Sequence, residues 1–341
     1  MSSREIIKNI VDRKKAERFG FWLGNPHPDS WEGLHKYFGT GTEEELRVKL
    51  GDDFRWITPQ YMETTYRHPE GKGIFDIYKT KSSLAESGPL ADAASVEDVD
   101  SYDWPSPEYL NFEECITTLK NAGDVYRASG FWMPFFHDVA DLFGMENLML
   151  NMYSNPAVVH HTINKVCGFY YEANKMFFSE SAGLVDALFF GNDFGTQFDL
   201  LISPAQFNEF FYPWIKKFAA QAKSDNLKVI KHSCGSVYKI IDRYIDAGID
   251  CLHPLQARAA DMDAETLSRG FNGRIAFMGG IDTQELLVNG SADDIKKEVR
   301  RIKKLLGPNL IVSPSHEAIL PNVPPRNIAA MAEEAIKVSD G

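Results

Sequence analysis

The chain has 341 residues, with 36 Lys and Arg against 48 Asp and Glu, so its formal net charge is −12. This acidic balance argues against a nucleic-acid-binding protein, which needs a basic surface to meet phosphates. The apolar share of 44% and the charged share of 25% are those of an ordinary globular protein. No stretch approaches the roughly 20 apolar residues that span a bilayer.

The N-terminal segment 1–18 is charged throughout and lacks the apolar core of a signal peptide. Four cysteines are too few for a disulfide framework in a chain of this length. They are Cys115, Cys167, Cys234 and Cys251. Together these features predict a cytoplasmic protein that does not bind membranes.

The first part of the chain contains few regular elements. Residues 6–11 place isoleucine and valine at helical spacing, and 19–23 reads as a short buried strand. The segment 25–110 is irregular and rich in aromatic residues, although 74–78 alternates like a strand. We expect residues 1–110 to supply a lead helix, the first strand and a helical or hairpin cap over the mouth of a larger domain.

After about residue 107, buried runs alternate with long amphipathic segments. The predicted strands are 127–133, 186–192, 227–232, 249–253, 274–279 and 309–314. The predicted helices are 111–121, 138–152, 156–182, 203–225, 236–247, 260–269, 291–306 and 325–338. Strands that are apolar on both faces and alternate with helices indicate a parallel sheet. Seven or eight such units predict one (β/α)₈ TIM-type barrel over residues 1–341. An open doubly wound sheet is the alternative fold. No Gly-x-Gly-x-x-Gly sequence follows any predicted strand, so the dinucleotide-binding form of that fold has no support.

Polar residues follow most of the predicted strands, where the active sites of such barrels lie. They include Asn25, His27, His137, Asn192, Asp193, His232, Cys234, His253, Gln256, His316 and Glu317. Turn geometry accounts for the glycines at these places and for Asn192. It accounts less well for the concentration of histidines beside one cysteine.

The His-x-Cys sequence at the end of one strand could bind a metal. Alternate residues of a strand point the same way, so His232 and Cys234 can direct an imidazole and a thiolate at one point. Zn²⁺ prefers these ligands, and a catalytic zinc needs three protein ligands plus an open position. His316, at the end of a later strand, could be the third ligand. The structural alternative is a buried thiol beside a hydrogen-bonded histidine.

Four segments resemble the uroporphyrinogen decarboxylase superfamily. They are GNDFGTQ with LISPAQFNEFFYPWIKKF, IKHSCGSVYKIIDRYIDAGIDCLHPLQ, MGGIDTQELL and LIVSPSHEAILPNVPPRNIAAM. The resemblance covers roughly residues 126–340 and implies a single (β/α)₈ barrel. It also implies one of two activities, which are decarboxylation of a haem-pathway tetrapyrrole and methyl transfer with a corrinoid protein.

Two differences between these branches decide which one the chain resembles more. The decarboxylases carry arginines after the first strand that hold the tetrapyrrole carboxylates, whereas the matching segment here, FWLGNPHPD, has none. We therefore do not expect uroporphyrinogen decarboxylation. The methyltransferases bind zinc through His-x-Cys and a later cysteine. His232 and Cys234 match the first two ligands, and His316 replaces the third, with Glu317 as an alternative ligand.

The resemblance thus implies a zinc-dependent methyltransferase that moves a methyl group between a small substrate and the cobalt of a separate corrinoid protein. Replacing one thiolate by imidazole makes the zinc a better Lewis acid for an ether oxygen. Aromatic residues near the strand ends favour a methoxylated aromatic substrate; they are Phe21, Trp22, Phe131, Trp132, Phe135, Phe136 and Phe194. The direction of transfer stays open.

Several further residues receive predicted roles. Asp193 could be a general acid for the leaving oxygen or a further metal ligand, and a turn-forming role is the structural alternative. His137 could donate a proton or orient a substrate carboxylate. Residues predicted to contact the substrate are Trp22, Asn25, His27, Phe194 and Gln256. The alternative functions are a metal-dependent decarboxylase or lyase acting on a small carboxylate, and a non-catalytic small-molecule-binding barrel.

Overall fold

The computed structural model describes residues 1–75 and 87–338. Eight parallel strands form a nearly closed barrel, in the order β1-β8-β7-β6-β5-β4-β3-β2. The strands are β1 (Gly20–Phe21), β2 (Phe54–Trp56), β3 (Tyr126–Ser129), β4 (Ala187–Gly191), β5 (Lys228–His232), β6 (Cys251–Leu255), β7 (Ala276–Ile281) and β8 (Leu310–Pro314). The predicted (β/α)₈ TIM-type barrel is therefore confirmed.

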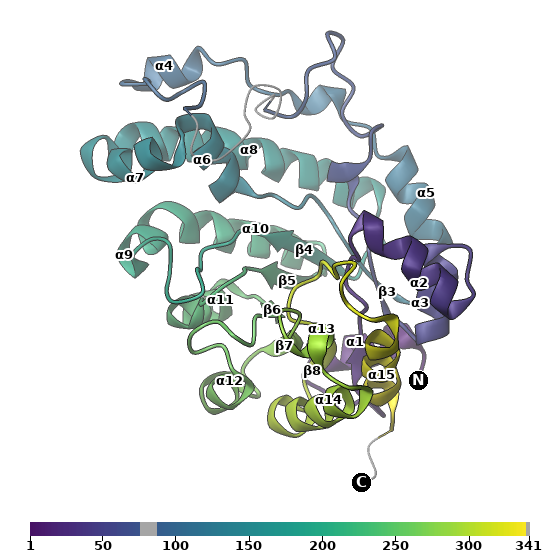
Figure 1. The fold of residues 1–341 in the computed structure, drawn as a ribbon. Helices are drawn as coiled ribbons and strands as arrows, with labels where there is room; N and C mark the ends of the chain where they lie inside the picture. Colours follow the sequence, from purple (N-terminus) through teal and green to yellow (C-terminus); the bar gives the residue numbers. More distant parts are fainter. Residues whose placement is uncertain (76–86, 339–341) are drawn as a thin grey trace.

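Helices surround the strands on the outside of the barrel (Figure 1). The helices of the repeating units are α5 (Glu113–Asn121), α8 (Pro156–Glu180), α10 (Tyr212–Ser224), α11 (Ile241–Ala247), α12 (Ala264–Phe271), α14 (Ala292–Leu306) and α15 (Pro325–Ile336). Further helices are α2 (Trp31–Phe38), α3 (Glu43–Leu50), α4 (Val96–Asp100), α6 (Phe135–Phe143), α7 (Met145–Ser154), α9 (Pro204–Gln206) and α13 (Leu286–Asn289). None of the described helices is both long and apolar enough to cross a membrane.

The lead helix α1 (Ser3–Val11) packs against the inside of the barrel at its N-terminal end. A capping box of Ser2 and Glu5 begins the helix, and its buried face joins the interior cluster that contains Trp22 and Phe54. Gly20 at the start of β1 makes room for this face, because a Cβ there would lie 2.4 Å from Ile7 Cδ1. The side chains of α1 therefore fill the end of the barrel opposite the predicted site.

Two expectations about the N-terminal part of the chain need correction. Strand β2 is absent from the predicted set, because three residues are too short for an alternating pattern to be recognised. The strand-like segment 74–78 is not a strand where it is described, since residues 74 and 75 form a bend, and 76–78 lie outside the described residues.

The described residues between β2 and α5 pack along the outside of the barrel. The Leu90 amide donates to the Leu142 carbonyl at the end of α6, and Phe75 packs against Phe169 and Tyr170 of α8. Figure 1 shows this blue segment running along α6, α7 and α8. Its predicted role as a cap over the mouth stays a prediction.

No ladder joins β1 and β2 in the described chain, but the Asp53 amide donates to the Phe21 carbonyl at 2.9 Å, and two carboxylates also bridge this seam. Asp53 accepts a hydrogen bond from the Phe21 amide at 3.0 Å, and Asp52 accepts one from the Leu23 amide at 3.2 Å. Arg18 donates two hydrogen bonds of 2.7 Å to the two oxygens of Asp53. The barrel therefore closes at this place through a backbone hydrogen bond and through the contacts of Asp52 and Asp53.

We expect Asp53→Ala to lower the free energy of unfolding by about 3–5 kcal/mol, because it leaves Arg18 and the Phe21 amide without their buried partner. Asp242→Ala is the control, since Asp242 pairs with Arg274 on the surface, and such pairs contribute roughly 0–1 kcal/mol. Urea unfolding measures both. Equal losses in the two variants would contradict a structural role for the seam.

A second prediction concerns Asp138 of α6, which accepts a hydrogen bond of 2.8 Å from the hydroxyl of Tyr170 on α8. Burial raises the pKa of Asp138 to about 8, whereas the pKa in an unfolded chain is about 4. The folded state thus binds the proton more tightly, and its stability falls as the pH rises between these two values. Asp138→Asn should remove this part of the pH dependence and stabilise the protein at about pH 8. Urea unfolding across this range tests it, and identical pH profiles for both proteins would contradict it.

Candidate functional site

The candidate site lies at the carboxyl ends of three neighbouring strands. Gly191 of β4 is in register with His232 of β5, which is in register with His253 of β6. Along each of these strands, side chains point in turn into the barrel and out toward the helices. The inward-pointing residues belong to the interior cluster, and by their spacing Gly191, His232 and His253 also point inward. Two histidines therefore stand side by side inside the barrel, on the level next to its mouth.

His232 forms the centre of a group of possible metal ligands. Its Nε2 lies 3.1 Å from Asp193 Oδ1 and 3.3 Å from Cys234 Sγ. One ligand atom from each of these three residues lies within 4.8 Å of the other two. His316, on the loop after β8, lies close enough to Cys234 for the thiol to raise the pKa of the imidazole, but it is not one of these three residues. The structure thus brings His232 and Cys234, two of the three predicted zinc ligands, together with Asp193, and it places His316 beside Cys234. Zinc binding by these residues stays a prediction.

Glu317 also reaches this group, as the alternative ligand. Its Oε2 lies 3.7 Å from His232 Nδ1 and 3.8 Å from His316 Nδ1. Within the described residues this oxygen is buried and has no hydrogen-bond partner. Gly24 lets the loop that carries Glu317 approach β1, because a Cβ on Gly24 would lie 2.5 Å from the Glu317 carbonyl oxygen.

The loop after β5 packs closely against the loops after β4 and β6. Gly235 has a φ of +80°, and a Cβ there would lie 2.3 Å from the carbonyl carbon of Gly195. The Cys234 amide donates to Asp193 Oδ1 at 2.9 Å, and the Gly235 amide donates to Gln256 Oε1 at 2.6 Å. Gln256 therefore supports the turn that carries Cys234, and its predicted contact with substrate stays a prediction.

The charges within the group stabilise one another. Burial raises the pKa of Asp193, but hydrogen bonding and charge from His232 outweigh burial, so the pKa is well below its usual range. Burial likewise opposes ionisation of Cys234 and His232. Their mutual contact nevertheless lowers the pKa of the Cys234 thiol, and together with Glu317 and Asp193 it raises the pKa of His232 well above its usual value. The lowered pKa makes it easier for Cys234 to form the thiolate that binds metals.

Lys231 is a site residue that was not predicted from the sequence. It is fully buried on the outer face of β5, and its ammonium donates hydrogen bonds to the carbonyls of Asn192 and His232. The same ammonium lies 5.1 Å from the ring centre of Phe190. Burial lowers the pKa of Lys231 to about 7. The position of this lysine directly before the His-x-Cys sequence could have drawn attention to it, although nothing in the sequence shows that it is buried.

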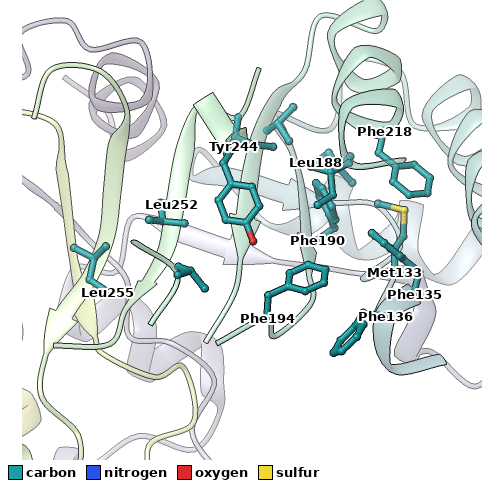
Figure 2. Close-up of a cluster of buried hydrophobic side chains, with 14 of the residues drawn as sticks. Met133, Phe135, Phe136, Leu188, Phe190, Phe194, Phe218, Tyr244, Leu252 and Leu255 are labelled. Carbon is teal, nitrogen blue, oxygen red and sulfur yellow. The ribbon is translucent and has the colours of Figure 1, made fainter. Parts of the chain in front are cut away.

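Most of the aromatic residues that we expected at the mouth of the barrel are buried. Trp22 and Phe194, both predicted to contact substrate, have no exposed surface. Figure 2 draws Phe194 and Phe136 within a cluster of buried side chains between the strands and the outer helices. Trp22 instead fills the barrel interior beside His253, with the ring centres 5.1 Å apart. Aromatic side chains near strand ends face the core here, because the surrounding helices cover them.

Two partly exposed tryptophans flank the metal-ligand group instead. The ring centre of Trp132 lies 4.9 Å from that of His232 and 4.8 Å from that of Trp56. Gly191 makes room for Trp132, since a Cβ there would lie 2.1 Å from an indole carbon. Trp56 was not predicted because it ends the unrecognised strand β2. Its indole nitrogen is buried and has no hydrogen-bond partner within the described chain.

The remaining predicted residues lie at different distances from this centre. His137, in the first turn of α6, is affected by the charges of Asp193 and His232, and burial lowers its pKa. His27 is exposed, and its Nδ1 accepts a hydrogen bond from the Asp29 amide at the start of a short helix. Asn25 lines a cavity of about 460 Å³ together with Trp56. Their catalytic and substrate roles stay predictions.

We expect Gly235→Ala to separate the loops after β4 and β5 and to weaken metal binding. Gly273→Ala is the matched control, because Gly273 has a similar φ of +77° but a Cβ added there would meet no atom within 4 Å. A left-handed backbone alone costs about 1–2 kcal/mol in the free energy of unfolding. The loss in the free energy of unfolding caused by Gly235→Ala should exceed that cost, and the variant should also bind zinc more weakly. Equal stability losses, with zinc affinity unchanged in both, would contradict the prediction.

Comparison with known proteins agrees with this architecture. A solved structure, a methyltransferase from Methanosarcina mazei, superposes with a TM-score of 0.64 over 98% of each chain, at 15% sequence identity. At that identity the likeness establishes the fold alone. No curated protein matches the chain significantly. The family model described as uroporphyrinogen decarboxylase (URO-D) matches residues 77–338. Because this match covers more than half of the sequence, the chain belongs to the uroporphyrinogen decarboxylase family.

Proposed function

We propose that the protein is a zinc-dependent methyltransferase. It would move a methyl group between a small substrate, with methoxylated aromatic compounds favoured, and the cobalt of a separate corrinoid protein. The observation that carries this proposal is the convergence of His232, Cys234 and Asp193 at the mouth of the barrel, with His316 beside the cysteine. Family membership and the shared fold of a methyltransferase are consistent with it.

The donor set suits zinc. Imidazole nitrogen, thiolate sulfur and carboxylate oxygen are the ligands that Zn²⁺ takes in proteins, and catalytic sites keep one position open. The buried Glu317 Oε2 has no hydrogen-bond partner among the described residues, as expected of an oxygen that faces a cation site. Zinc bound here would act as a Lewis acid that makes the methyl-bearing oxygen a better leaving group.

The surrounding residues would bind and orient the substrate. The partly exposed indoles of Trp56 and Trp132 offer an aromatic ring an edge or face to pack against. Asp193 keeps its negative charge, which favours its predicted role as a ligand over that of a general acid. His137 carries an N–H that would hydrogen-bond the departing oxygen, which keeps the electron pair of the broken methyl–oxygen bond and must gain a proton.

Tetrapyrrole decarboxylation is less well supported. The two buried arginines beside the first loops, Arg47 and Arg55, are already paired with acidic residues. Arg47 contacts Asp52 at 2.8 Å, and Arg55 contacts Glu44 at 2.7 Å. Neither guanidinium is therefore free to hold the carboxylates of a polyanionic substrate.

The first test is the zinc content of the purified protein. We expect about one zinc per chain, and loss of stoichiometric zinc in His232→Ala and in Cys234→Ser. Cys115→Ala should keep its zinc, because Cys115 lies on α5, away from the site. Unchanged zinc in the His232 and Cys234 variants would contradict the metal site.

The second test measures methyl transfer to free cob(I)alamin through the change in absorbance of the corrinoid. Methoxyarenes, methylamines and methyl thiols form the substrate panel, and we expect methoxyarenes to react. Zinc binding without transfer from any of them would contradict the reaction class. A metal-free protein that binds a small carboxylate tightly would favour the non-catalytic barrel, and one that releases carbon dioxide from it would favour a decarboxylase.

A further inference from the structure

His253 is a buried histidine of the site to which the proposed function gives no role. It is aligned with His232 on the neighbouring strand, and its imidazole has no exposed surface. The two Nδ1 atoms lie 3.0 Å apart, which is hydrogen-bond distance. Two ring nitrogens at this distance require that one carries a hydrogen and the other accepts it.

The surroundings of His232 decide which nitrogen carries the hydrogen. Its Nε2 faces Asp193 Oδ1 and Cys234 Sγ, so this nitrogen points into the metal-ligand group. A ring nitrogen binds a metal through its lone pair, and the ring hydrogen must then sit on the other nitrogen. For His232 that other nitrogen is Nδ1, which faces His253.

We infer that His253 is a positioning residue: its Nδ1 accepts a hydrogen bond from the Nδ1–H of His232 and so holds His232 in the tautomer whose Nε2 is free to bind the metal. This inference rests on the proposed function, in which His232 is a zinc ligand. Metal-binding histidines generally donate their second N–H to a carboxylate, a carbonyl or water, and that partner fixes the ring. Here a second imidazole takes this place.

The surroundings of His253 are consistent with an acceptor at Nδ1. A neutral imidazole that accepts at Nδ1 carries its hydrogen on Nε2, and in the described residues this Nε2 is buried with no hydrogen-bond partner. Aromatic rings surround it, with the ring centres of Trp22 and Phe189 at 5.1 and 5.3 Å. Aromatic faces are weak acceptors for an N–H, so they tolerate the hydrogen there and fix the ring plane.

Glu317 is the competing group. Its Oε2 lies 3.7 Å from His232 Nδ1, which is beyond hydrogen-bond distance. Ligand atoms of His232, His253 and Glu317 also lie within 4.8 Å of one another, so a second metal is the alternative interpretation of this group. The hydrogen-bond distance between the two Nδ1 atoms favours a shared hydrogen, and metal stoichiometry separates the two interpretations.

Two near-isosteric variants isolate the acceptor. Asn and Leu both branch at Cγ, so His253→Asn and His253→Leu leave similar space, but only Asn offers an oxygen near the position of Nδ1. Zinc affinity, measured by chelator competition on the full chain, should fall by about 10–100-fold in His253→Leu. It should be largely retained in His253→Asn. Equal weakening in both folded variants would overturn the inference, as would two zinc ions per wild-type chain with one lost in both.

Nuclear magnetic resonance of ¹⁵N-histidine-labelled wild-type protein gives a test that does not depend on the variants folding. We expect a proton on His232 Nδ1 and a coupling through the hydrogen bond between the two Nδ1 atoms, with and without zinc. A zinc-bound protein whose His232 Nδ1 lacks a proton would overturn the inference. If the protein binds no zinc, the proposed function fails, while the coupling in the metal-free protein still decides whether His253 accepts this hydrogen bond.

Discussion

The pairing of neighbouring parallel strands in register is the constraint on which the site depends. Because β4, β5 and β6 are paired residue for residue, Gly191, His232 and His253 stand on one level inside the barrel. The glycine leaves space that Trp132 fills, and the two histidines meet through their rings. A shift of β5 by one residue would turn His232 to the outer core and Lys231 to the inside. The same register thus places His232, the possible metal ligand, inside the barrel and Lys231 on its outer face.

The electrostatics of the site follow from grouping charges where water is excluded. Burial disfavours ionisation of His232, Asp193 and Cys234 individually, but the positive charge of His232 lowers the pKa of both Asp193 and Cys234, and their negative charges raise the pKa of His232. The cluster is also fastened to the backbone, since Asp193 accepts a hydrogen bond from the Cys234 amide. The sulfur of Cys234 and the imidazole of His232 are thereby held 3.3 Å apart before any metal or substrate binds.

Much of this arrangement was predictable from the sequence, and the failures have physical reasons. Seven strands and the positions of His232, Cys234 and His316 follow from apolar runs and from the rule that barrel sites lie at strand ends. Strand β2 was not predicted because three residues are too few to show the alternation of apolar and polar side chains that is typical of a strand. Trp22 and Phe194 were assigned to the mouth because a sequence gives strand ends but not the faces that helices cover. The contact between His232 and His253 depends on strand register, which the separate strand patterns do not reveal.

The seam between β1 and β2 has a consequence for how the protein behaves toward other chains. A barrel that lacks one ladder is topologically an open sheet with two edges, and free edge amides are a template for pairing with foreign strands. At this seam the carboxylates of Asp52 and Asp53 already occupy the amides of Leu23 and Phe21. Any strand that sought to add itself there would have to displace buried, charge-assisted hydrogen bonds. The contacts that close the barrel at this seam therefore also disfavour pairing of its edge with the strand of another chain.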